Sequence, residues 1–220
     1  MTMSSDRWDA TNRYIDDLFG REDSILEELR VEARAAGLPA IEVSSGQGRF
    51  LQLLASMADA RDILEIGTLG GYSTIWLARG MSPDGRLITV EYEDRHADFA
   101  VAQFEKAGLA DRIEVRRGDG HDVVAALQGE LGDDSLDVVF VDADKDGYPA
   151  YWRALRSMVR VEGLILIDNA LGTGSTWIDD LSSPGVRAID EANRMAAEDP
   201  DYETALLSIR EGLLVGRRLR

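Results

Sequence analysis

The sequence predicts an α/β fold built on a mostly parallel sheet, and three features of the chain support this prediction. From Asp62 onward, short apolar runs alternate with stretches long enough to form helices. The runs are mostly apolar, as is typical of parallel strands that helices cover on both faces. Further along, the runs 203–209 and 213–215 are separated by only three residues. Because so short a connection joins only antiparallel neighbours, we expect a C-terminal hairpin.

Seven strands are expected in this sheet. The apolar runs that predict the five parallel strands are Ile63–Ile66, Leu87–Val90, Ile113–Val115, Val138–Val141 and Leu164–Ile167. The segments that predict crossover helices are Ser73–Arg79, Arg95–Ala107, Asp122–Leu131 and Tyr151–Val159. A last helix over Val186–Ala197 precedes the antiparallel pair.

The region before Asp62 is expected to be helical. Apolar residues recur at roughly helical spacing through the first 37 residues, and the sequence GLP at 37–39 ends this run. A second amphipathic helix follows, with its apolar face between Phe50 and Met57. We expect one domain, in which residues 61–220 form the core and residues 1–60 form a dimer contact or a lid over the substrate.

The composition is that of an ordinary globular protein and limits the possible partners. The 220 residues are 45% hydrophobic and 30% charged, and the absence of cysteine excludes disulfides and thiolate zinc sites. A formal net charge of -17 argues against nucleic-acid binding. No apolar run approaches bilayer length and the first nine residues are polar, so we expect no membrane partner and a cytoplasmic location.

A glycine-rich turn follows the first predicted strand. The sequence EIGTLGG at 65–71 leads into a helix near Ser73. Glycines there let the chain turn sharply while a ligand approaches the backbone, and ligands of open α/β sheets bind at this edge. The same glycines also fit a tight strand–helix turn that binds nothing.

Three acidic residues indicate which ligand this turn would bind. Glu91 closes the second strand, where a carboxylate accepts hydrogen bonds from a ribose diol. Glu65 precedes the glycines, where it would repel a pyrophosphate but suit a ligand that carries an ammonium and a sulfonium. The spacing also differs from the GxGxxG of dinucleotide binders, which favours S-adenosylmethionine over NAD. Asp119, after the third strand, would lie beside the adenine, and it also fits a helix N-cap.

Acidic residues end the fourth and fifth strands as well. The sequence DADKDG at 142–147 resembles the start of a calcium-binding EF-hand loop, but Arg153 stands where that loop needs glutamate, and a strand precedes it instead of a helix. Asp168 and Asn169 end the neighbouring strand. Two carboxylates and an amide oxygen that converge there form an oxygen-only site, most naturally for Mg²⁺. Taken singly, each acid also fits a helix cap or a turn.

The motifs together resemble the cation-dependent O-methyltransferase family, which includes catechol and caffeoyl-CoA O-methyltransferases. The resemblance covers residues 43–216 and rests on LEIGTLGGYS at 64–73, FVDADKDGY at 140–148 and IDN at 167–169. It implies the Rossmann-like class I methyltransferase fold, whose last strand inserts antiparallel into the sheet. It also implies a homodimer, since the family is often dimeric.

The resemblance also assigns roles to individual residues. It implies that Asp142, Asp168 and Asn169 hold Mg²⁺, or another divalent cation such as Mn²⁺ or Ca²⁺, and that Lys145 is the general base. A dication disfavours the protonated form of a neighbouring lysine and stabilises a phenolate. The implied contacts to S-adenosylmethionine are Val43, Glu65, Gly67, Thr68, Ser73, Glu91, Asp119, Gly120, Asp142 and Asp144.

The substrate end is expected to bind a small hydroxylated aromatic molecule. Thr173 stands where the plant caffeoyl-CoA enzymes of this family carry an asparagine that contacts substrate, which argues against a CoA ester. A catechol-type molecule or an aromatic natural product fits better. Tyr148 and Trp177, with Thr173, are candidate substrate contacts, although aromatic residues near a helix are more often core. We expect His96 to be a solvated surface residue.

Three other functions are weighed from the residues alone. A metal-independent S-adenosylmethionine enzyme could act on another atom, with the strand-end acids in a structural role. A nicotinamide oxidoreductase is disfavoured by the turn at 65–71. A protein that binds the cofactor without turnover would share every motif.

Overall fold

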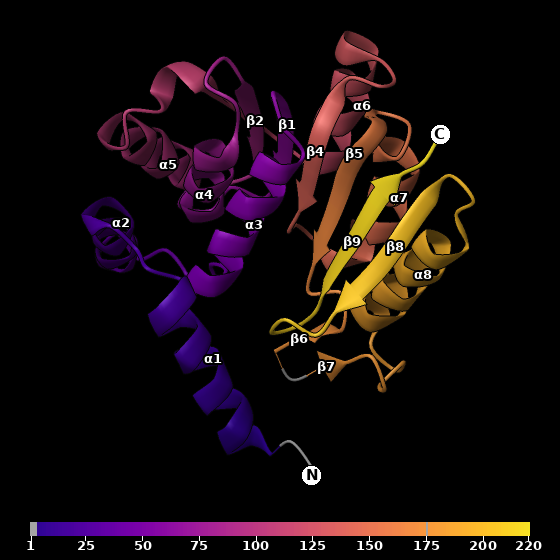
Figure 1. Cartoon of the computed structure of the whole chain (residues 1–220), viewed down its shortest axis with the longest axis horizontal. Helices are drawn as coiled ribbons and strands as arrows, with labels where there is room; N and C mark the ends of the chain where they lie inside the picture. The colour runs from indigo at the N-terminus through magenta and orange to yellow at the C-terminus, as the bar shows by residue number, and fades with distance from the viewer. Residues whose placement is uncertain (1–3, 175) are drawn as a thin grey trace.

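The apolar runs of the sequence form a seven-stranded sheet between two layers of helices (Figure 1). The computed structural model describes residues 4–174 and 176–220. The strands of the sheet are β1 (Asp62–Ile66), β2 (Arg86–Glu91), β3 (Ile113–Arg117), β4 (Leu136–Val141), β5 (Val159–Asp168), β8 (Tyr202–Leu207) and β9 (Leu213–Arg218). Their order is β3-β2-β1-β4-β5-β9-β8, with β1 to β5 parallel and β9 antiparallel to both β5 and β8. This confirms the predicted fold class and the antiparallel insertion of the last strand.

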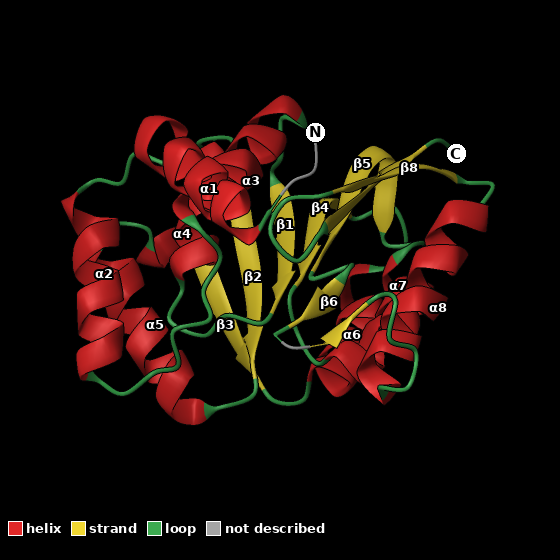
Figure 2. Ribbon diagram, turned by 90° about the horizontal axis from the view of Figure 1, so that it is seen from below, coloured by secondary structure: helices red, strands yellow, loops and turns green. Residues whose placement is uncertain are grey.

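Helices cover both faces of the sheet (Figure 2). The helices on one side are α2 (Ser24–Ala35), α3 (Ser45–Met57), α4 (Tyr72–Gly80) and α5 (Asp94–Lys106), with α2 packed on α4 and α5. The helices on the other side are α6 (Gly120–Leu131), α7 (Tyr148–Leu155) and α8 (Pro184–Glu198). Short 3₁₀ turns η1 (Ala110–Arg112) and η2 (Lys145–Gly147) and a small antiparallel pair, β6 (Gly172–Thr173) and β7 (Thr176–Trp177), complete the described elements.

The two faces of the sheet bury two separate hydrophobic cores. Along β4, Val138 and Phe140 pack toward the α3–α5 side, whereas Val139 and Val141 pack toward the α6–α8 side. Alternation along a strand explains this division. Because β4 is buried along its whole length, the first accessible side chains after it come at its carboxyl end, where acidic residues of the motifs lie.

The N-terminal helical run differs from the prediction, because the structure divides it into α1 (Ser5–Phe19) and α2. Asp23 starts α2 by accepting a hydrogen bond from the backbone N of Leu26 at 3.2 Å. Gly20 lies so close to α3 that a Cβ there would stand 2.4 Å from the hydroxyl oxygen of Ser45. The apolar periodicity continues across this break and so conceals it.

Two boundaries near β5 also differ from the prediction. The helix expected over Tyr151–Val159 is α7 (Tyr148–Leu155), and Val159 already belongs to β5, where it pairs with Leu136. A register shift between Leu136 and Val138 accommodates this early start. The small β6–β7 pair was not predicted, because two-residue strands carry no recognisable period.

Helix α1 extends away from the rest of the molecule (Figure 1). Its attachment includes a hydrogen bond from the backbone N of Gly46 to the carboxylate of Asp16, 2.8 Å long. Several large apolar side chains of α1 are exposed, among them Tyr14 and Phe19, each at 62%. Within the residues that the structure describes, no helix is long and apolar enough to cross a membrane.

Asp137, at the start of β4, ties three segments of the fold together. One carboxylate oxygen accepts hydrogen bonds from the backbone N of Arg61 (2.7 Å) and of Asp62 (2.8 Å), and the other accepts from the guanidinium of Arg160. Burial alone would raise the pKa of Asp137, but the donors of Asp62, Arg160 and Arg61 outweigh it and lower the pKa below its usual value. The ionised carboxylate is therefore the form that stabilises the fold.

We expect Asp137→Asn to lower the free energy of unfolding by about 2–3 kcal/mol at pH 7, because it leaves Arg160 without its buried counter-charge. The difference from wild type should persist above about pH 4 and shrink as the pH falls through the lowered pKa of the folded state. Urea unfolding at several pH values measures this. Asp84→Asn is the control, since the exposed Arg61–Asp84 pair should contribute less than about 1 kcal/mol. Equal losses in the two variants would contradict the assigned role of Asp137.

Candidate functional site

A cavity of about 830 Å³ opens at the carboxyl ends of the parallel strands. The segments that line it include the turn after β1, the ends of β2, β4 and β5, the start of α6, the loop at 39–43 and the β8–β9 turn. Ligands of open α/β sheets bind at this edge, near the point where the strand order reverses. The strand order places that point between β1 and β4.

Most of the predicted site residues line this one cavity. They are Val43, Gly67, Thr68, Ser73, Glu91, Asp119, Gly120, Asp142, Asp144, Lys145, Asp168, Asn169 and Thr173. Glu65, Tyr148 and Trp177 are not among the lining residues. Glu65 and Tyr148 are buried behind the cavity wall, and the side chain of Trp177 is 41% exposed.

The turn after β1 requires glycine at two positions. Gly67 has a φ of 101°, and a Cβ there would stand 2.1 Å from the carbonyl oxygen of Asp142. Gly71, which precedes α4, has a φ of 84°, and a Cβ there would stand 2.5 Å from the ring of Phe104. The glycines therefore let the cofactor turn lie directly against the end of β4, so the two motifs share one site.

Glu65 is buried next to the cavity and holds one of the residues that line it. Its carboxylate is fully buried and accepts hydrogen bonds from the hydroxyls of Ser73 (2.6 Å), Thr74 (2.5 Å) and Thr89 (2.6 Å). Burial raises the pKa of Glu65 to about 7, against the lowering effect of these donors. Glu65 thus orients Ser73, which does line the cavity. The expected direct contact between Glu65 and a cofactor remains a prediction.

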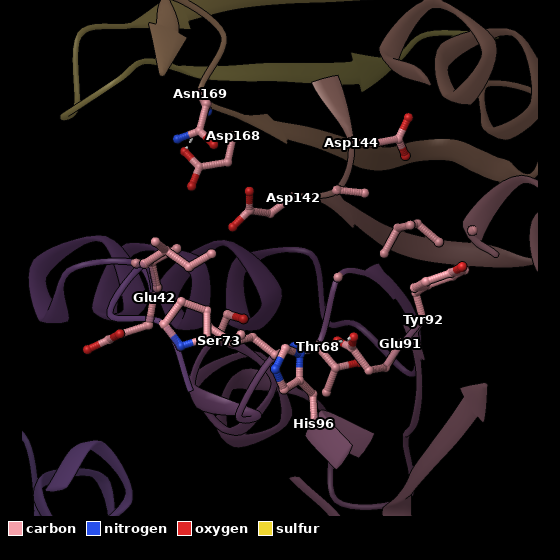
Figure 3. A pocket seen from close by; sticks show the side chains of 18 of the residues that line it. Glu42, Thr68, Ser73, Glu91, Tyr92, His96, Asp142, Asp144, Asp168 and Asn169 are labelled. Atoms are coloured by element: carbon pink, nitrogen blue, oxygen red, sulfur yellow. Dashed lines mark hydrogen bonds and ion pairs between the residues drawn. The ribbon is translucent and has the colours of Figure 1, made fainter. Parts of the chain in front are cut away.

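Glu91 and His96 lie close together beside the turn that follows β1 (Figure 3). One carboxylate oxygen of Glu91 accepts a hydrogen bond from the backbone N of Leu69 at 2.7 Å, and the other accepts from the backbone N of Glu93 at 2.9 Å. The ring Nδ1 of His96 lies 3.5 Å from Glu91. His96 lines the cavity with its side chain only 16% exposed, so the prediction of a solvated surface residue was wrong.

The start of α6 forms a third wall. Asp119 caps this helix by accepting from the backbone N of His121 at 2.9 Å, as the alternative interpretation of Asp119 predicted. The His121 ring stacks on that of Tyr151 with centroids 4.2 Å apart. The hydroxyl of Tyr151 donates to Asp144 at 2.9 Å. These contacts hold Asp119 and Asp144 on one side of the cavity.

The strand-end acids converge as the sequence predicted. Asp142, Asp168 and Asn169 project from the ends of β4 and β5, with the carboxylates of Asp142 and Asp168 facing the same space (Figure 3). Burial and the nearby charge of Asp142 raise the pKa of Asp168 to about 7. Repulsion between two partly desolvated carboxylates is what a bound cation relieves, so this donor set fits a hard divalent ion.

Few side chains at this site are available to bind a metal ion. Within residues 4–174 and 176–220, no three or more His, Cys, Asp or Glu side chains are grouped so that they could hold a metal ion. The candidate set is smaller, with two carboxylates and one amide, so water would have to complete the shell. The buried Gln47 on α3 is a neighbour of Asp168, and its Nε2 has no hydrogen-bond partner among the described residues.

Lys145 is the basic side chain at this edge of the sheet. Its Nζ donates to Asp142 at 2.9 Å and to the hydroxyl of Tyr148 at 2.7 Å, and it lies 5.0 Å from the centre of that ring. The Tyr148 hydroxyl in turn donates to the backbone oxygen of Asp168 at 2.9 Å. Burial raises the pKa of Tyr148 well above its ordinary value, so it remains a neutral phenol. The buried Tyr148 therefore helps to hold the Nζ of Lys145 in position.

Sequence reasoning missed four charged residues of the cavity wall, which are Glu42, Glu93, Arg210 and Glu211. Arg210, in the β8–β9 turn, lines the cavity together with Glu211 and Thr173. A positive φ of 47° at a non-glycine residue indicates a constrained backbone, but the sequence alone does not reveal that angle. No motif marks this position.

Comparisons with known proteins identify the family of the chain. Residues 17–219 match the sequence model of a family described as O-methyltransferase. A catechol O-methyltransferase of Niastella koreensis is 37% identical over 207 residues, 94% of this chain and 93% of the relative. A catechol O-methyltransferase of Mycobacterium tuberculosis is 41% identical over 194 residues, 88% and 86% of the two chains. The crystal structure of the O-methyltransferase TomG from Streptomyces achromogenes, in complex with SAM, superposes with a TM-score of 0.88 at 33% identity over 100% of both chains.

A parallel sheet with an inserted antiparallel strand, a glycine turn and a polar cavity at the strand ends define a nucleotide-type ligand site. The chain belongs to the O-methyltransferase family.

Proposed function

We propose that this protein transfers a methyl group from S-adenosylmethionine to a phenolic hydroxyl of a small aromatic substrate, with a divalent cation at Asp142, Asp168 and Asn169. The observation that carries the proposal is that a single cavity joins the glycine turn and Glu91 to this oxygen-donor set and Lys145. The solved relative in complex with SAM, and the relatives named catechol O-methyltransferase, support the same reaction.

The methyl donor would occupy the half of the cavity formed by β1, β2 and α6. Glu91 is held by two backbone N–H groups, so its remaining acceptor capacity faces the cavity for a ribose diol. Asp119, fixed as the cap of α6, lies where an adenine would be bound. Ser73, oriented by Glu65, and the backbone of the turn would receive the amino-acid end.

The substrate would occupy the half formed by β4, β5 and the β8–β9 turn. A divalent cation, when bound by Asp142, Asp168 and Asn169, supplies Lewis-acid stabilisation of a phenolate. Lys145 would accept the proton of the hydroxyl at its Nζ and retain it beside Asp142. Thr173 lies at the open end of the cavity, where it would contact the ring substituents. The methyl group then passes directly to oxygen in one displacement.

The test combines binding with turnover. Isothermal titration should show that the protein binds S-adenosylmethionine and not NADH. Mass spectrometry of reactions with a catechol should then show a product heavier by one methylene, formed with Mg²⁺ and lost with EDTA. NADH binding without S-adenosylmethionine binding would refute the reaction class, and methylation unchanged by EDTA would refute the metal site alone.

We further propose that the chain is one catalytic domain whose helix α1 contacts a second copy. The exposed apolar side chains on α1 are typical of a surface that another chain covers. Sedimentation equilibrium should give about twice the 24.2 kDa of one chain. A Tyr14→Glu, Phe19→Glu double variant should sediment as a monomer, and a monomeric wild type would exclude the dimer.

A further inference from the structure

Arg210 occupies a defined place at the mouth of the cavity. Leu213, three residues further on, pairs with Asp168 in the sheet. The backbone oxygens of Glu211 and Gly212 accept hydrogen bonds from Leu171 (2.7 Å) and Ala170 (3.0 Å), the residues that follow the proposed metal site. The β8–β9 turn is therefore fastened to the substrate half of the cavity, and Arg210 with it.

The side chain of Arg210 extends from the β8–β9 turn to the loop at 39–43, a second segment of the cavity lining. Its Nη1 donates to the backbone oxygen of Glu42 at 3.2 Å, in the loop before α3. Its Nε lies 3.3 Å from the carboxylate of Glu211, which partly balances its charge. Nη2 has no hydrogen-bond partner among the residues that the structure describes. The guanidinium is thus held in place with donor capacity left over.

The charge of Arg210 is unusual for its surroundings. Among the described residues that line the cavity, only Lys145 and Arg210 carry a lysine or arginine side chain, while acidic residues line every other wall. Lys145 is engaged by Asp142 and Tyr148. Apart from Lys145 and the proposed metal, Arg210 is therefore the one described group of the cavity lining that would attract an anionic group on a substrate.

We propose that Arg210 is a specificity-determining residue that binds a carboxylate carried by the hydroxylated aromatic substrate. The planar fork of a guanidinium matches a carboxylate, and Nη2 is the donor available for it. This inference rests on the proposed function, since it assigns a substrate class to the same site. It selects singly charged aromatic acids with adjacent hydroxyls over their neutral counterparts.

The experiment compares 3,4-dihydroxybenzoate with its neutral methyl ester, at saturating S-adenosylmethionine and Mg²⁺. We expect wild-type kcat/KM to favour the acid by about tenfold or more, a factor that one charge-assisted hydrogen bond can supply. Arg210→Gln should remove this preference, mainly by raising KM for the acid, and should change kcat/KM for the ester by less than about threefold. Arg210→Lys should retain part of the preference, because it keeps the charge but loses the fork.

Arg34→Gln is the matched control. Arg34 also binds Glu42, at 2.7 Å through its side chain, but does not line the cavity. It should leave the acid-to-ester ratio unchanged. Equal loss of preference in Arg34→Gln and Arg210→Gln would show that Arg210 acts only by holding Glu42, and would overturn the proposal. A wild type that methylates both substrates equally well also overturns it, whereas methylation of neither refutes the proposed function itself.

Discussion

Lys145→Met should lower kcat for a catechol by roughly 10²–10⁴-fold, the range that a positioned general base contributes. The Nζ of Lys145 is fixed by Asp142 and Tyr148 at the edge where the hydroxyl would lie, and methionine fills a similar volume without a proton acceptor. The dissociation constant for S-adenosylmethionine, measured by titration, should change by less than about threefold, because the loss occurs in the reaction step.

Two further variants separate the base from the charge. Lys145→Arg keeps a cation beside Asp142, but a guanidinium does not release its proton in a protein, so it should be as inactive as Lys145→Met. Lys106→Met replaces the only other lysine of the sequence, which pairs with Glu32 away from the cavity, and should retain full activity. Activity near the wild-type level in Lys145→Arg would exclude the role as a base.

Asp168→Asn should remove metal-dependent activity, with a loss of at least about 100-fold that Mg²⁺ in excess does not restore. The substitution keeps the shape of the side chain but removes one of two charges that face a shared space. Without metal, the variant should be at least as stable as wild type, since the repulsion from Asp142 is relieved.

Thermal unfolding provides a readout that does not depend on activity. Mg²⁺ should raise the melting temperature of wild type by a few degrees or more, about the shift expected when a ligand binds only the folded state. It should leave that of Asp168→Asn unchanged. Asp179→Asn, in a segment outside the cavity lining, is the control and should respond to Mg²⁺ like wild type. An equal shift in Asp168→Asn would place the cation elsewhere.

Much of the site could be predicted because a parallel sheet brings the ends of its strands to one edge. Apolar runs located β4 and β5, and that placement was enough to bring Asp142 and Asp168 together. The role of the glycines at 67 and 71 could be predicted for a similar reason, since the sharp turn between strand and helix requires a positive φ that other residues rarely adopt. In both cases local chemistry and the sheet geometry determine the position.

What could not be predicted depends on contacts between segments distant in sequence. His96 looked like a surface residue because the pattern of its own helix does not show that Glu91 and the β1 turn lie beside it. The sequence also does not reveal that three hydroxyls from α4 and β2 donate to the carboxylate of Glu65. The break at Gly20 likewise follows from its approach to α3.

The position of β9 affects how the protein folds during synthesis. β9 follows β8 along the chain but lies between β5 and β8 in the sheet, paired with both. The half with β1, β2 and β3 can therefore assemble as it leaves the ribosome, while the edge of β5 stays unpaired until residues 213–218 have been made. The half of the cavity proposed for the methyl donor can thus form before the half proposed for the acceptor is complete, and for that interval the unpaired β5 edge is open to pairing with another chain.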